Sequence, residues 1–289
     1  LLWLPHFGHT FSRWHIQKNI LYIEHIIFMP SLLFQLIAPF LLSCGVVILI
    51  TVLAERYGTK AGGILGTLPS TIVVAFLFIA LNKGTAFAAR AAVVVPAEMG
   101  INIVFLFIFS LLAHRSVYGA LALSLFIWML LSFILYMAEL ENIALSMVVY
   151  FAVMLSAFFF LEKRKRVPSS GRVAVHYSAT KLLFRGVFAG IVIAIAVALA
   201  NIGEMMSGIF SVFPAIFLST MLIFIREHGP AFTGSMGKAM ILGTLSVMSY
   251  GVCIHFFYPT AGIWVGSAAA YAVALTITLS LFMLRKRMT

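Results

Sequence analysis

The 289-residue chain contains no aspartate, only eight acidic residues and only two cysteines. Without aspartate it cannot build the usual phosphoryl-transfer site, and it has no Walker loop, nucleophile elbow, His-Glu-x-x-His or Cys-x-x-Cys motif. Cys44 and Cys253 lie in apolar stretches without metal-ligand spacing, and we interpret them as reduced packing residues. We therefore predict that the protein is not an enzyme and has no cofactor or metal site.

Charge is also scarce. Only 9% of the residues are charged while 63% are hydrophobic, which excludes a water-soluble core of this length. The net charge of +11 does not indicate nucleic acid, because the cations occupy short loops between apolar runs. We predict an all-α polytopic membrane protein whose partners are the lipid bilayer and an unknown small-molecule or ion substrate. A homo-oligomer is left open.

Runs of about 20 apolar residues are typical of transmembrane helices. Hydropathy predicts nine of them, joined by short polar connections except for a basic linker at 162–181. The predicted spans are 32–54, 62–81, 87–113, 118–138, 143–161, 182–200, 206–225, 232–257 and 261–284.

Residues 1–28 differ from the rest of the chain. They hold four of the eight histidines but neither a long apolar run nor a signal-peptide pattern, and Met29 stands just before the first strong span. We expect 1–28 to be read-through or a disordered extension, and 29–289 to be a single membrane domain. The alternative is an amphipathic helix lying on the membrane surface.

An internal repeat relates residues 58–87 to residues 203–232 at a constant offset of 145. Apolar matches mean little in such a hydrophobic chain, but glycines and a proline in register are informative, and internal repeats define architecture. The matched small residues are Gly58, Gly63, Pro69, Gly84 and Ala86 with Gly203, Gly208, Pro214, Gly229 and Ala231.

Positive charge separates strongly between the two predicted sides of the membrane. From Met29 onward, fifteen Lys and Arg residues fall on one side, and only Lys83 and Arg90 fall on the other. By the positive-inside rule, the first side is cytoplasmic. This places the C-terminus inside, the residue-29 end outside and the repeats in opposite orientations.

The predicted architecture is therefore a 4+1+4 inverted repeat. Repeat A covers about 32–138 and repeat B about 182–284. A linking helix at 143–161 reverses direction between them, and the basic linker 162–181 follows it.

Each repeat carries a proline motif that should kink or break its helix, because proline lacks a backbone donor. In lipid such breaks are tolerated where they face protein or a wet cavity, and paired broken helices are typical of transporter sites. The alternative is close helix packing, with the hydroxyls bonded to backbone carbonyls. The candidate substrate-binding residues are Gly66, Thr67, Pro69, Ser70, Thr71, Ser211, Pro214 and Ala215.

Ionisable residues inside a membrane are functional candidates by default. Glu98 lies in mid-span and is our candidate coupling residue; the alternative is a protonated, hydrogen-bonded structural glutamate. Lys238 is the candidate charge on the repeat-related span, and an interaction with Glu98 is a hypothesis. We expect Arg90 and Arg185 to extend to the membrane surface.

The pattern from Gly62-Gly63 to Pro69-Ser70-Thr71, followed by Lys83-Gly84, resembles the GlpM-like inner-membrane proteins. The second copy, from Ser207-Gly208 to Pro214 with Gly229, has a similar pattern. The resemblance implies an uncharacterised membrane protein or predicted permease, present here as a tandem inverted duplication. It supplies no substrate and no catalytic residue.

These features predict a secondary transporter or permease that works by alternating access between the repeats. The alternatives are a non-transporting structural or assembly protein and a lipid flippase or channel. A polar pocket near the bilayer midplane would favour transport, and a dry, closely packed interface would favour the structural role.

Overall fold

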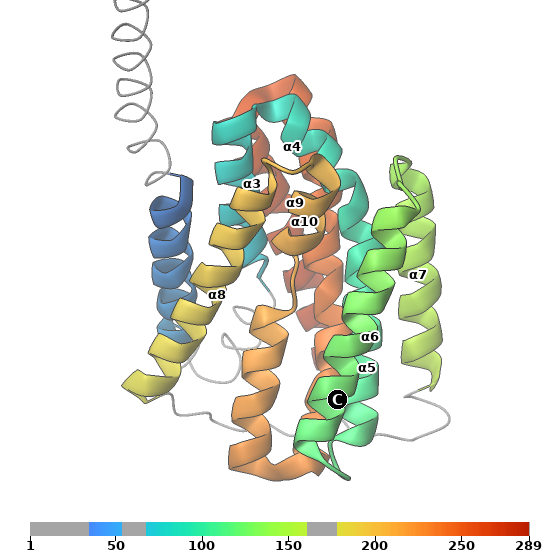
Figure 1. The fold of residues 1–289 in the computed structure, drawn as a ribbon. Coiled ribbons are helices and arrows are strands. Elements are labelled where there is room, and N and C mark those ends of the chain that lie inside the picture. Colours follow the sequence, from blue (N-terminus) through green and yellow to red (C-terminus); the bar gives the residue numbers. More distant parts are fainter. Residues whose placement is uncertain (1–34, 54–67, 161–177, 289) are drawn as a thin grey trace, which may run out of the picture.

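The computed structural model of the protein describes residues 35–53, 68–160 and 178–288 (Figure 1). These residues are almost entirely helical and contain no strand, so the all-α prediction is confirmed for the described part of the chain. The predicted N-terminal extension and most of the basic linker lie outside the described residues, as do Gly66 and Thr67.

Helices before residue 138 form what we call the N-terminal unit. They are Gln35–Leu53, α3 (Ser70–Lys83), α4 (Thr85–Ala91), the 3-10 turn η1 (Ala92–Val94), α5 (Val95–Leu112) and α6 (Val117–Met137). Helix α7 (Ile143–Phe159) follows this unit. Side-chain caps fix the starts of two of these helices: Ser116 accepts from the Gly119 amide before α6, and Asn142 accepts from the Ala144 and Leu145 amides before α7.

Helices after residue 178 form the C-terminal unit. They are α8 (Ala179–Leu199), α9 (Glu204–Ser211) and α10 (Ala215–Met288). Helix α10 is not one continuous rod. Its backbone leaves the helical region at Gly229 (φ 77°, ψ 177°) and Gly262 (φ 73°, ψ −177°), which divides it into segments 215–228, 230–261 and 263–288.

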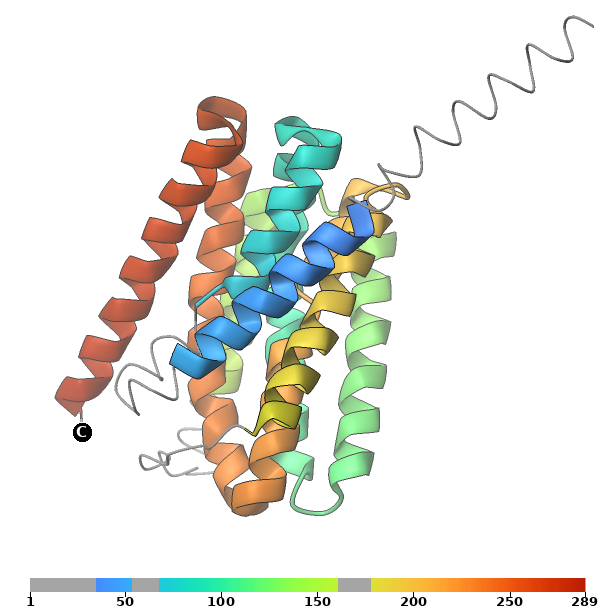
Figure 2. The same ribbon diagram turned by 90° about the vertical axis from the view of Figure 1, so that its left-hand side faces the viewer.

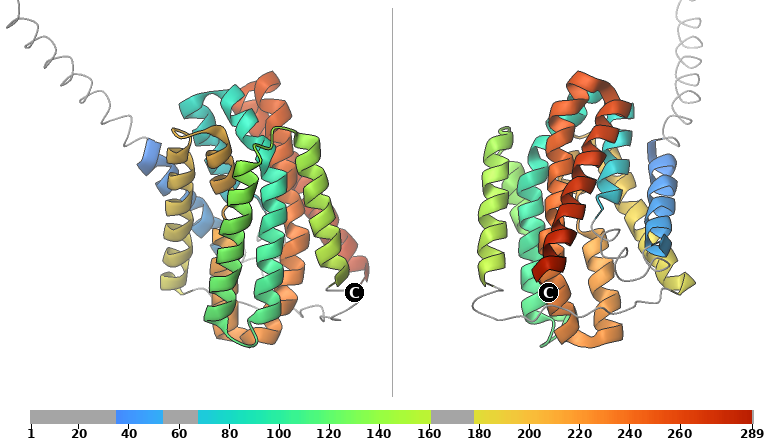
Figure 3. Two further views of the ribbon diagram at one scale, coloured as in Figure 1. Left: turned by 45° about the vertical axis from the view of Figure 1, so that its right-hand side comes forward. Right: turned by 180° about the vertical axis from the view of Figure 1, so that it is seen from behind.

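The corresponding helices of the two units run in opposite directions (Figures 1 and 3). Helix α3 leads up to the turn into α4 at the upper end of Figure 1, whereas segment 215–228 of α10 leads down to a turn at the lower end. Helix α7 lies at the periphery beside α5 and α6, and the C-terminus lies at the lower end.

Helix Gln35–Leu53 crosses α8 at one side of the bundle (Figure 2). Two glycines of α8 make this crossing close. A Cβ on Gly186 would lie 2.8 Å from Ile48, and one on Gly190 would lie 2.8 Å from the carbonyl oxygen of Phe40. Small residues at such crossings let membrane helices approach each other closely.

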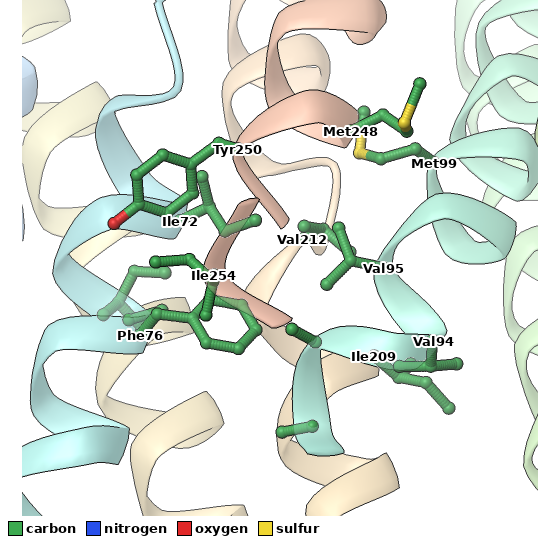
Figure 4. Packing of buried hydrophobic residues seen from close by; sticks show 14 of the residues in the cluster. Ile72, Phe76, Val94, Val95, Met99, Ile209, Val212, Met248, Tyr250 and Ile254 are labelled. Atoms are coloured by element: carbon green, nitrogen blue, oxygen red, sulfur yellow. The ribbon is translucent and has the colours of Figure 1, made fainter. Parts of the chain in front are cut away.

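The core is formed jointly by the two units (Figure 4). Ile72 and Phe76 of α3 and Val95 of α5 are buried in one cluster with Ile209 of α9 and Ile254 of α10. By contrast, α6 and α7 expose large apolar side chains such as Phe133 and Val148. A buried shared core beneath an apolar outer surface is typical of a membrane helix bundle.

Among the described residues, six helical stretches are long and apolar enough to cross a membrane, judged by length and composition. Met240–Leu281 is one of these stretches, and the turn at Gly262 folds it back on itself. The six are Gln35–Leu53, Thr85–Leu112, Val117–Met137, Ala179–Leu199, Glu204–Ile223 and Met240–Leu281.

Candidate functional site

The two predicted proline motifs have matching backbone structures. Helix α3 starts directly after Pro69, and the Ser70 amide donates to the Leu68 carbonyl over 2.8 Å. Helix α10 starts directly after Pro214, and the Ala215 amide donates to the Phe213 carbonyl over 2.7 Å. The same tight turn therefore precedes both helices, at positions 145 residues apart.

The match extends to the far end of each helix. Gly84 follows α3 with φ 88° and ψ 164°, and Gly229 ends segment 215–228 with φ 77° and ψ 177°. This region of backbone space is essentially restricted to glycine. The sequence repeat therefore corresponds to two helices with the same start and the same terminal turn.

In the C-terminal unit the proline motif interrupts a membrane-length stretch. Helix α9 ends at Ser211 and α10 begins at Ala215, which leaves carbonyls without helical partners. One of them, the Val212 carbonyl, accepts a hydrogen bond of 2.6 Å from the amide nitrogen Nδ2 of Asn102 on α5. The N-terminal unit thus satisfies the helix break of the C-terminal unit.

Glu98 lies one helical turn before Asn102 and is completely buried. Its Oε1 accepts a 2.8 Å hydrogen bond from the Ser132 hydroxyl of α6. Its Oε2 has no hydrogen-bond partner among the described residues. Glu98 therefore holds one satisfied and one unsatisfied oxygen near the middle of the stretch Thr85–Leu112.

Trp128 connects the carboxyl group to the helix break. Its indole lies beside Glu98, and its ring packs edge-on against Phe213, with centroids 4.9 Å apart. Its N–H is the donor nearest the carboxyl group after the Ser132 hydroxyl, but it makes no hydrogen bond of full geometry with any described residue. We call Glu98, Asn102, Ser124, Trp128 and Ser132, together with the Val212 carbonyl, the Glu98 cluster.

The Glu98 cluster is unusual in the number of buried polar atoms that lack a partner. Buried polar groups are nearly always hydrogen-bonded, so each exception needs an explanation. Within the described part of the chain, these atoms are Glu98 Oε2, Asn102 Oδ1, Ser124 Oγ and Trp128 Nε1. The atoms of Glu98, Asn102 and Trp128 lie where α5, α6 and the α9–α10 break meet, and Ser124 lies one turn from Trp128 on the same face of α6.

The predicted binding residues that are described lie at the start of α3 and at the α9–α10 break, and they are mostly buried. Pro69, Ser70, Pro214 and Ala215 are buried, and Thr71 is half-buried. Ser211 is also buried, but its hydroxyl donates to the Gly208 carbonyl over 2.6 Å, which is the backbone-bonding alternative. Lys238 lies in segment 230–261 of α10, and its side chain is outside the described part, so its interaction with Glu98 stays a prediction.

Our expectation for Arg185 is wrong. Its side chain does not extend to the surface but is buried, and its Nη1 donates to the Thr220 hydroxyl of α10 over 2.9 Å. The expectation used only the depth of Arg185 along its helix. Arg185 lies on the face of α8 that packs inside the bundle, where a polar partner from the same unit is available.

An ion pair joins the units at their upper end in Figure 1. The Arg90 guanidinium of α4 contacts both carboxylate oxygens of Glu204 on α9, with Nε–Oε1 and Nε–Oε2 distances of 2.7 and 2.8 Å. Both side chains are accessible, at 61% and 30% of their full exposure. The pair is therefore a surface contact between units.

Sequence reasoning identified Glu98 but not its neighbours. Asn102 follows Glu98 by four residues, and Ser124, Trp128 and Ser132 repeat every four residues in α6. This spacing places each set on one helix face. A search for polar residues sharing a face with the mid-span glutamate would have identified Asn102.

Residues 36–141 match the model of a protein family described only as a protein of unknown function, DUF3147. No curated protein and no solved structure matches the chain. The matched segment begins within helix Gln35–Leu53 and ends just after α6, so it covers the N-terminal unit alone. The GlpM-like resemblance belongs to the proposal that follows.

Proposed function

We propose that the protein is a secondary transporter built from two antiparallel four-span units with α7 as the reversing helix. In this arrangement, nine spans form a tandem inverted duplication of a GlpM-like unit. The matching turns at Pro69 and Pro214, the matching glycines 84 and 229 and the opposite helix directions support it. The family match, which spans one unit, agrees with a duplicated ancestor.

The distribution of charge supports one orientation in a prokaryotic inner membrane. Arg115, Lys181 and Arg226 belong to the turns and helix ends at the lower end of Figure 1, whereas Lys83 and Arg90 belong to the upper end. Because cationic loops remain in the cytoplasm, the lower end and the C-terminus are cytoplasmic in this proposal. Helix Gln35–Leu53 then begins outside.

The transport proposal depends mainly on the helix break between α9 and α10. Asn102 of the N-terminal unit donates a hydrogen bond to the Val212 carbonyl in this break of the C-terminal unit. In inverted-repeat transporters, broken helices at the interface between repeats form the substrate and ion sites. Here the break contacts the buried carboxyl group of Glu98 through Trp128. A movement of one unit against the other would open this contact.

A specific observation also favours a second function, that of a non-transporting structural or assembly protein. The described residues around the start of α3 and around the α9–α10 break are closely packed. A Cβ added to Gly208 would overlap the Ala91 carbonyl oxygen, and Ser70, Ser211 and Ala215 have less than a tenth of their surface exposed. If the protein is a transporter, this closely packed structure is its occluded state, in which the site is closed to both sides of the membrane.

Cysteine accessibility separates the two functions. Ser70→Cys and Ala215→Cys would be introduced one at a time into full-length protein in which Cys44 and Cys253 are replaced by alanine. A membrane-impermeant thiol reagent would be applied from either side of proteoliposomes, with and without an imposed ion gradient. Lys83→Cys and Arg115→Cys, which are exposed at opposite ends, are the controls for sidedness.

For a transporter, we expect the side from which each buried cysteine is labelled to change with the gradient. The controls should keep their sides. Protection of both buried cysteines under every condition would reject alternating access and favour the structural function.

A further inference from the structure

The Glu98 carboxyl group has fewer hydrogen bonds than its two oxygens can accept. It is fully buried and accepts one hydrogen bond from the neutral Ser132 hydroxyl. Its second oxygen completes no hydrogen bond in the described part of the chain, and the only other donor near the carboxyl group is the neutral Trp128 N–H. A bare carboxylate in such surroundings is very unfavourable. A positive charge must therefore reside on or beside Oε2 in this conformation.

No side chain of the described residues supplies this charge. On α6 the groups facing Glu98 are Ser132 and Trp128, and no charged neighbour acts on the carboxyl group. Helix α10 also packs against α5, and its described titratable side chains are the uncharged Tyr250, Cys253, Tyr258 and Tyr271, His255 and the exposed Arg226. His255 and the titratable groups of α7 and α9 are bonded elsewhere. Tyr150 of α7 bonds Thr244, His255 of α10 bonds the Ala89 carbonyl, and Glu204 of α9 pairs with Arg90.

Close packing at the cluster argues against a metal cation as the ligand. An alkali or alkaline-earth cation needs about six oxygen ligands in a cavity of its own size. The unsatisfied oxygens of the residues placed beside the carboxyl group are Glu98 Oε2 and Asn102 Oδ1, with the Phe213 ring against Trp128 between the units. A proton needs one acceptor and almost no space.

We propose that the Glu98 cluster is a proton-binding site whose occupancy holds the two units together at the α9–α10 break. With the proton on Oε2, the group is neutral and Oε1 remains the acceptor of the Ser132 hydroxyl. Loss of the proton leaves a buried anion that draws in water and separates α6 from Phe213. The coupling part of this inference rests on the proposed transport function, whereas the proton site itself does not.

A hydrophobic carbodiimide tests the proton site directly, because it modifies protonated carboxyl groups in apolar surroundings. Full-length protein in proteoliposomes would be treated over a range from mildly acidic to alkaline pH, and modified glutamates would be identified by mass spectrometry. We expect labelling of Glu98 that falls about tenfold per pH unit once the ionised form dominates. Glu204, which is paired and accessible, is the internal control.

Matched variants sharpen this experiment. Ser132→Ala removes the hydroxyl that stabilises the anion, so labelling of Glu98 should persist to higher pH than in the wild type. Glu98→Gln keeps the shape of the protonated side chain and should fold but lose the label. Absent or pH-independent labelling of Glu98, or protection by sodium at constant pH, would overturn the proton assignment.

Coupling is tested separately by labelling Ala215→Cys from both sides across the same pH range. We expect its labelling to change severalfold with pH when Glu98 is present and to become independent of pH in Glu98→Gln. If carbodiimide labelling of Glu98 titrates but Ala215→Cys never responds, the proton site stands and its coupling to transport is rejected.

Discussion

At the position where α5 of the N-terminal unit carries Glu98 and Asn102, the related helix segment of the C-terminal unit carries Gly243 and Val247. The same holds for the neighbouring helix, where valine and isoleucine stand 145 residues after Trp128 and Ser132. Yet the turns at Gly84 and Gly229 have nearly the same dihedral angles. The backbone turns are therefore similar in the two units, whereas the polar residues Glu98 and Asn102 occur only in the N-terminal unit. The broken helix that Asn102 hydrogen-bonds belongs to the C-terminal unit.

This difference separates the repeated backbone turns from the polar residues, which are not repeated. Backbone turns are set by proline and glycine, which are present in both copies. Polar residues inside a membrane are costly, and a site at a unit boundary needs only one set. At these related positions, the N-terminal unit therefore contributes polar residues to the boundary and the C-terminal unit contributes apolar ones.

The largest predicted effect concerns the closest approach between the units. Gly208→Ala places a Cβ against the backbone carbonyl of Ala91, which cannot move as a flexible side chain can. We expect a loss of stability of about 3 kcal/mol or failure to fold, measured by thermal unfolding in detergent. Gly203→Ala, whose Cβ would meet nothing within 4 Å, is the control and should be nearly neutral.

The next effect tests whether the two glycine turns are equivalent. Gly84→Ala and Gly229→Ala each force a side chain into a positive-φ conformation, although neither Cβ would contact another atom. We expect each to cost about 2 kcal/mol, because the penalty is local strain. Unfolding midpoints that differ strongly between the two variants would contradict the equivalence of the units.

Asn102→Leu should have a somewhat smaller effect. It leaves the Val212 carbonyl unsatisfied inside the bundle, at a cost of about 1.5 kcal/mol in thermal unfolding. The matched change in the other unit, Val247→Leu, removes no hydrogen bond and should alter stability much less. Equal losses in both variants would mean that volume, rather than the hydrogen bond, determines the effect.

The smallest effect belongs to the Arg90–Glu204 pair. Because both side chains are accessible, the coupling free energy in a double-mutant cycle of Arg90→Ala and Glu204→Ala should be about 0.5 kcal/mol and should fall with added salt. A coupling several times larger that resists salt would show that this pair, and not the Glu98 cluster, is the main link between the units.

The sequence predicted the helical class and the helix break at Pro214, and it matched Gly84 with Gly229, because these features depend on local residue chemistry. It also identified Glu98, since any ionisable group within an apolar span stands out. It did not predict the Asn102–Val212 hydrogen bond, because the partners are 110 residues apart and one is a backbone atom. It misjudged Arg185, because depth along a helix does not tell which face is buried.

The hydrogen bond from Asn102 to Val212 also has a consequence for synthesis. The donor is made 110 residues before its acceptor, which at about 5–20 residues per second corresponds to roughly 5–20 s. Throughout this interval the Asn102 amide has only the weak acceptor Met99 Sδ within its own helix, at 3.5 Å, and the N-terminal unit lacks the surface that will cover it. Insertion of the first helices and completion of the bundle are therefore separate events.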